Sequence, residues 1–187
     1  VDAAAGRKLL PDDPDLEREV RQDADYYRLT MGGGVVNWAY WHFLPHKWMN
    51  WPSFTTGVPW FEKLFVLFGY SILKSLMTKG IGLSDKNAAA GLDEVYRAFD
   101  SLDKKLIDGR PYLHGDRPYY SDLAFAASAA PMVLARGYGG HLPAAQDTPP
   151  EICKVVLELR DRCVFLSIRH LIPESSARCF RTIRHPC

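Results

Sequence analysis

The stretch FDSLDKKLIDGRPYLHGDRPYYSDLAFAASAAPM, residues Phe99–Met132, decides the fold of this chain. Its first part completes a segment with apolar residues at helical spacing, and Gly109 follows as a stop signal. Its last part, from Asp122 onward, is uncharged and rich in alanine. Small side chains let neighbouring helices pack closely. We therefore predict two helices joined by a turn, the second at the centre of the fold.

Helical periodicity continues on both sides of this stretch. The Asp13–Pro14 pair is typical of a helix start. Further helices are expected at residues 61–77, 84–109 and 150–166, and no strand-like alternation is present. The sequence predicts an all-α fold, a bundle of about five to seven helices. The apolar stripe of the first helix consists of Leu16, Val20, Ala24, Tyr27 and Met31.

Several local features add narrower expectations. Gly32, Gly33 and Gly34 should weaken or bend the first helix, because glycine is a poor helix former. Residues 45–59 contain three prolines and a glycine and are expected to form a loop. The helix at 61–77 should be mostly buried, and Pro131 should kink the alanine-rich helix.

Composition limits the class of protein. The 187 residues (21.1 kDa) are 47% apolar with a net charge of +1, which fits one globular domain and argues against a dedicated nucleic-acid binder. The longest uncharged run, 29–46, holds three glycines and a proline, and the apolar stretch 64–73 is short, so no transmembrane segment is expected. The cysteines are interpreted as reduced thiols of an intracellular, reducing compartment, with the organelle left open: Cys153, Cys163, Cys179 and Cys187.

A turn and a helix start carry a resemblance to a known family. Tyr112-Leu113-His114-Gly115, followed by Asp122 and small apolar residues, resembles the C-terminal helical domain of glutathione S-transferases. The Tyr26-Tyr27 pair, the WAYWHFLP run at 38–45 and the Val58-Pro59-Trp60 entry look like one branch of that family. The resemblance implies structural roles for Gly115 and Asp122. It implies an extension at 1–11, the helical domain at 12–170 and a basic tail at 171–187.

The resemblance also implies what is missing. In glutathione S-transferases an N-terminal thioredoxin-like domain binds glutathione and supplies the catalytic residue. Nothing in this sequence resembles that domain, and the eleven residues before Asp12 are too few for a βαβ unit. We therefore expect no thioredoxin-like domain and no cofactor, with glutathione as a cofactor only if such a domain exists upstream.

Catalytic and metal-binding constellations are not expected. Cys179 lies beside Arg178 and Arg181, which would favour a thiolate, but a surface thiol is the simpler interpretation. His42 and His46 have the spacing of two ligands on one helix face, yet Pro45 separates them and no acidic residue or cysteine lies nearby in sequence. We predict no catalytic residue and no metal site.

All five tryptophans fall between residues 38 and 60. Three aromatic residues in the proline-bounded segment, Trp48, Trp51 and Phe54, are the predicted partner-binding residues, because exposed tryptophan often anchors an interface. Core packing and a membrane–water boundary are the alternatives.

Three functions follow. The leading prediction is a non-catalytic, glutathione S-transferase-like interaction module, docked by protein partners as a subunit of a larger assembly. The alternative is the hydrophobic-substrate half of a glutathione S-transferase, with Tyr27, Met31 and Val35 lining an apolar site. The third is a binder of an apolar ligand or pigment. Nucleic acid is not expected as a partner, and peripheral membrane contact stays open.

Overall fold

The computed structural model describes residues 8–135, 138 and 140–162, and these residues are mostly helical. Within them no β-strand is present beyond an isolated Tyr112–Gly115 bridge, which confirms the all-α prediction. The elements are α2 (Pro14–Asp25), η1 (Tyr26–Met31), α3 (Gly32–Phe43), α4 (Lys47–Thr55), α5 (Trp60–Ile81), α6 (Asp85–Lys105), α7 (Tyr120–Ala129), η2 (Ala145–Asp147) and α8 (Pro150–Arg160).

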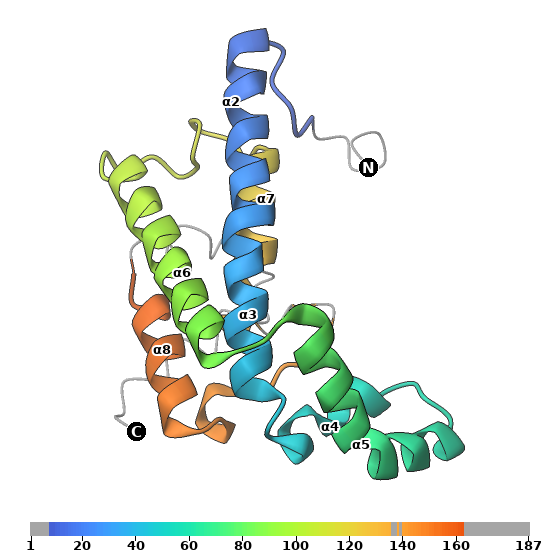
Figure 1. Cartoon of the computed structure of the whole chain (residues 1–187). Helices are drawn as coiled ribbons and strands as arrows, with labels where there is room; N and C mark the ends of the chain where they lie inside the picture. The colour runs from blue at the N-terminus through green and yellow to red at the C-terminus, as the bar shows by residue number, and fades with distance from the viewer. Residues whose placement is uncertain (1–7, 136–137, 139, 163–187) are drawn as a thin grey trace.

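The first three elements form one long rod at the centre of the molecule (Figure 1). Asp13 caps its start by accepting a hydrogen bond from the Asp15 N–H at 3.1 Å, as the Asp-Pro signal predicts. The rod does not break at the glycine triplet, because Gly32 begins α3 directly. Its irregularity lies one turn earlier, where η1 is a π-helix.

The other bundle helices pack around this rod. α6 lies against α3, and α7 lies against α2. The Tyr96 hydroxyl of α6 contacts the Glu158 carboxylate of α8 at 3.0 Å. The core between the helices is built from the expected stripes and includes Tyr27, Met31, Val95, Phe99, Leu102, Phe125, Ile152 and Val156.

The helix α7 is shorter than the sequence suggested. It ends at Ala129, so Pro131 follows the helix and does not kink it. The chain then turns, and the Arg160 guanidinium of α8 donates to the carbonyls of Val133 and Leu134 at 2.8 and 3.2 Å. Phe125 and Ala129 of α7 are buried, whereas Tyr120 and Leu123 are exposed, so α7 packs on the rod with one face and does not lie at the centre as the sequence suggested.

Two expectations about residues 45–81 are wrong. The predicted loop contains the helix α4, which tolerates Pro52 in its interior. The predicted mostly buried helix is the 22-residue α5, in which Tyr70 alone is buried. Because α5 packs mainly on α4 and both extend away from the bundle, no described element covers its outer side (Figure 1).

Part of the sequence-based domain division lies outside the described residues. The first seven residues of the 1–11 extension, the end of the 12–170 domain and the basic tail at 171–187 belong to this part. Cys163, Cys179 and Cys187 also lie there. Of the four cysteines, the structure describes Cys153, which is buried in α8.

Candidate functional site

The most unusual surface of the described chain is formed by residues 47–81, which we call the arm. The arm consists of α4, α5 and the turn between them. By length and composition alone, α5 could cross a membrane. This differs from the expectation that its apolar stretch is short, because the helix continues through Lys63 and Lys74. Its exposed large apolar residues are Trp60, Phe61, Leu64, Phe65, Phe68, Ile72, Leu76 and Ile81.

Five of these residues form a line along α5. Phe61, Phe65, Phe68, Ile72 and Leu76 are separated by steps of four, three, four and four, which places them on one helix face. We call this line the outer stripe. Phe65 is 79% exposed and Phe68 is 80% exposed. Sequence reasoning missed the outer stripe, although its spacing was readable, because an apolar helix is ordinarily assigned to the core.

The predicted partner-binding residues all lie on α4. Trp48 is 70% exposed, whereas Trp51 and Phe54 are half-buried. The rings of Trp48 and Trp51 lie 5.7 Å apart, and Phe54 packs edge-on against Tyr70 of α5 at 6.0 Å. The three residues are thus part of the arm, but Phe54 mainly joins α4 to α5. Trp48 is the one that presents most of its surface to solvent.

A buried polar network fixes the base of the arm. The Asn50 amide donates to the Phe43 carbonyl at 2.5 Å and to the His46 carbonyl at 3.1 Å. The Tyr70 hydroxyl donates to the Leu44 carbonyl at 3.0 Å and lies 3.3 Å from the same amide. These bonds satisfy carbonyls at the end of α3, so α4 and α5 are held in one place relative to the bundle.

The arm is also basic. It contains Lys47, Lys63, Lys74 and Lys79 against one acidic residue, Glu62. The Lys47 ammonium donates to the Leu67 carbonyl and lies 5.3 Å from the Trp48 ring. In a chain whose formal charge is only +1, this segment carries a local charge of +3, from four lysines minus one glutamate.

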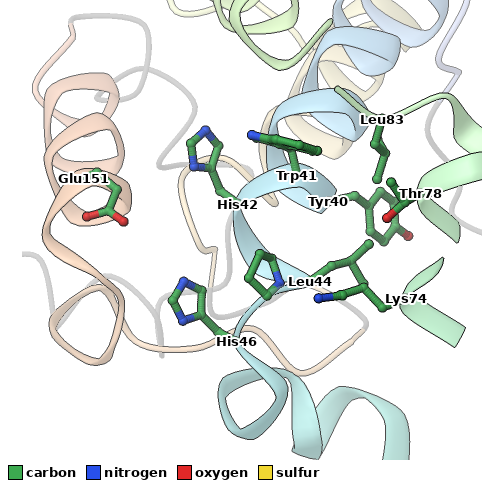
Figure 2. Close-up of a pocket in the computed structure, with 10 residues that line it drawn as sticks. Tyr40, Trp41, His42, Leu44, His46, Lys74, Thr78, Leu83 and Glu151 are labelled. Carbon is green, nitrogen blue, oxygen red and sulfur yellow. The ribbon is translucent and has the colours of Figure 1, made fainter. Parts of the chain in front are cut away.

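A cavity of about 410 Å³ lies where the arm joins the bundle (Figure 2). His42 and His46 come from α3 and the turn after it, Lys74 comes from α5, and Glu151 comes from α8. The cavity therefore combines imidazole, ammonium and carboxylate groups. Among the described residues no group of three histidine, cysteine or acidic side chains is arranged to hold a metal ion.

Burial sets the state of His42. Its ring packs on Trp38 with centroids 4.7 Å apart. Burial lowers the pKa of His42, while the charges of Glu151 and Asp85 act in the opposite direction. The net effect is a pKa lower than the ordinary histidine value of 6.5, so burial favours the neutral form of the ring.

A second, more apolar cavity of about 360 Å³ lies beside the first and shares Tyr40 and Leu44 with it. It is lined by Val35, Ala39 and Phe43 of α3, by residues of the arm such as Phe54 and Met77, and by the segment after α7. Ser53 of α4 donates to the His141 carbonyl at 2.5 Å and closes one side. This cavity can hold a small apolar molecule.

The three predicted apolar-ligand residues do not line one common site. Val35 lines the second cavity, but Tyr27 and Met31 are fully buried in the core and line neither described cavity. Tyr27 packs edge-on against Phe125 at 5.2 Å, and burial raises the pKa of its hydroxyl far above the ordinary value. The π-helix that carries both residues packs against α7 and also against α6.

The two predicted structural residues lie at the start of α7. Gly115 has φ of +130°, a backbone conformation that favours glycine. The two oxygens of the Asp122 carboxylate accept the Leu113 and Tyr119 N–H groups, each at 2.9 Å. Burial raises the pKa of Asp122, and the two N–H donors act to lower it. Asp122 thereby ties the 112–115 turn to the helix.

Comparison with known proteins gives no relative: no protein-family model, no curated protein and no solved structure matches this chain. The resemblance to glutathione S-transferases therefore depends on the residues themselves. The candidate functional site is defined by the geometry of the arm and of the two cavities.

Proposed function

We propose that this chain is a non-catalytic helical interaction module, related in fold to the C-terminal domain of glutathione S-transferases, that docks in a larger assembly through the arm. The single observation that carries the proposal is the exposed outer stripe of α5. A helix in which most residues are apolar is ordinarily buried. Monomeric soluble proteins rarely leave so long an apolar surface uncovered.

The relation to glutathione S-transferases is supported by the start of α7. The carboxylate of Asp122 contacts both the helix start and the preceding turn, where Gly115 has a positive φ. Gly115 and Asp122 are two of the positions that carry the sequence resemblance.

Size measurement of the tagged 187-residue chain, expressed in its own cells and extracted in mild detergent, tests the proposal. The wild type should elute far above its own mass of 21.1 kDa. The variant Trp48→Ala/Phe65→Ser/Phe68→Ser should elute as a free monomer, because it removes three exposed apolar side chains of the arm. A matched control, Leu29→Ser/Ile107→Ser, changes exposed apolar residues outside the arm and should behave as the wild type.

A wild-type protein that elutes at its own mass would contradict the proposal. Conjugation of glutathione to an electrophile by the purified 187-residue chain, above the uncatalysed rate, would contradict its non-catalytic part. The two measurements are independent, so the docking role and the absence of transferase activity are tested separately.

The second cavity favours a second candidate function, the binding of an apolar ligand or of the hydrophobic substrate of a transferase. Its volume of about 360 Å³ falls in the range of small-molecule sites. Saturable binding of an apolar fluorescent dye should be lost in Ala39→Phe, because the added ring fills the cavity. Equal dye binding by both proteins would remove this candidate.

A further inference from the structure

The surface that the arm would meet is indicated by three properties of α5: its length, its outer stripe and the charges around it. A helix of 22 residues is about 33 Å long, close to the thickness of the hydrocarbon core of a bilayer. Yet the two ends of the arm lie close together, because Leu44 before the arm and Leu83 after it line the same cavity.

Because the two ends of the arm are neighbours, α5 does not cross a membrane in the described arrangement. A crossing helix needs its two ends on opposite sides of the bilayer. Here α4 stays beside α5 through the contact of Phe54 with Tyr70 and that of Lys47 with Leu67. The arrangement instead suits a helix that lies in the plane of the membrane surface, with its apolar side toward the acyl chains.

The charges specify the kind of membrane. The arm carries four lysines and one glutamate. By helical spacing, Lys63 and Lys74 lie on the opposite side of α5 from the outer stripe, so they would lie among the headgroups when the stripe faces the acyl chains. Lysines near a bilayer surface are attracted by anionic lipids. The exposed rings of Trp48 and Trp60 are of the type enriched at that boundary.

We propose that the arm binds the surface of a bilayer containing anionic lipids, with α5 parallel to the membrane plane. This inference rests on the proposed function and names the surface that the arm contacts. A second copy of the chain is a poorer occupant, because two arms of the same positive charge would face one another. A protein partner remains as an outcome of the experiment.

Vesicle flotation of the purified 187-residue chain tests the proposal. The protein should float with vesicles of 70% phosphatidylcholine and 30% phosphatidylserine, and binding should weaken with added salt. It should float much less with phosphatidylcholine alone. Tryptophan fluorescence should be quenched more by lipids brominated near the headgroup than by lipids brominated at the chain ends, as expected for a helix in the surface plane.

Two sets of variants assign the binding to the arm. Phe65→Ser/Phe68→Ser/Ile72→Ser should lower the partition coefficient by roughly a hundredfold or more, because three apolar side chains no longer enter the membrane. Lys74→Gln should lower it by about fivefold, on anionic vesicles only. The matched controls are Leu29→Ser/Ile107→Ser and Lys86→Gln/Lys104→Gln, which should bind as the wild type.

The lysine variant changes only an exposed side chain, so it keeps the test valid if the stripe variant does not fold. Absence of the wild-type protein from the floated fraction would overturn the proposal, as would equal binding by wild type and both arm variants. The protein could fail to bind vesicles and still elute, after extraction from cells, in a large complex that depends on the arm. In that case the membrane inference fails and the proposed function stands. If both measurements fail, both proposals fail.

Discussion

Gly34 of α3 and Gly91 of α6 lie with their backbones in direct contact. A Cβ atom added to Gly34 would lie 2.7 Å from the Gly91 carbonyl oxygen, and one added to Gly91 would lie 2.5 Å from the Gly34 carbonyl oxygen. Both distances are shorter than any ordinary contact, and the neighbouring atom is backbone in each case. The closeness of α3 and α6 therefore requires glycine at both positions.

Alanine at either of these glycines should destabilise the fold. We expect Gly34→Ala and Gly91→Ala each to lower the free energy of unfolding by about 1–3 kcal/mol, because the two helices must move apart. Gly33→Ala is the matched control. Its Cβ would have no neighbour within 4 Å, so it should stabilise α3 by about 0.5–1 kcal/mol. Urea denaturation measures the free energy of unfolding of all three variants. Equal changes for Gly33→Ala and Gly34→Ala would contradict the packing argument.

Loss of the Asp122 carboxylate should cost more than loss of a simple helix cap. Asp122→Ala leaves the buried Leu113 and Tyr119 N–H groups without their acceptor, and we expect a loss of about 2–4 kcal/mol. Asp13→Ala removes an exposed cap that accepts one N–H and should cost about 1 kcal/mol. Thermal unfolding of both variants tests the difference, which would be absent if Asp122 acted only as a cap.

Asp23 should make stability depend on acid pH. Burial acts to raise its pKa, but hydrogen bonds from His114 and Lys105 outweigh burial and hold the pKa below 3.8. Folded Asp23 thus binds its proton less tightly than unfolded Asp23. Its contribution of about 1 kcal/mol, limited by solvent screening, is complete above pH 3.8 and is lost as the pH falls through the lowered value.

The variant Asp23→Asn isolates this contribution. The difference in unfolding free energy between wild type and variant should be constant from pH 5 to pH 7 and should shrink below pH 3.8. A difference that stays the same down to pH 2 would show that the charge of Asp23 does not contribute.

His42 should titrate below pH 6.5, because burial lowers its pKa. Unfolded histidine takes up a proton first as the pH falls, so this residue should destabilise the folded state progressively below pH 6.5. Glu151→Gln should lower the pKa of His42 further, since the Glu151 charge acts to raise it. NMR titration of the imidazole measures the shift. Glu19→Gln, on an exposed position of α2, is the control and should leave the titration unchanged.

The helices that the sequence predicted well are those with one apolar and one polar side. The stripe through Val95, Phe99 and Leu102 is buried as expected, because its periodicity identifies both the helix and the face that packs. The Asp13 cap was equally readable, since capping is decided by neighbouring residues.

The arm was predicted poorly for a physical reason. Pro52 and its neighbours suggested a loop, yet the segment is the helix α4, whose buried Asn50 bonds the His46 carbonyl and the Tyr70 hydroxyl of α5. The helix α5 was expected in the core because most of its residues are apolar. The sequence shows that most side chains of such a helix are apolar. It does not show which surface covers them, because that depends on the tertiary structure or on a partner.

The shared lining of one cavity by Leu44 and Leu83 has an architectural consequence. The chain leaves the bundle and re-enters it at neighbouring points, so everything between behaves as an insertion in a hairpin of α3 and α6. A short turn could replace that insertion and leave the Gly34–Gly91 packing unchanged. The same segment could be transplanted between other closely spaced helix ends, which would test the proposed membrane binding in a new host.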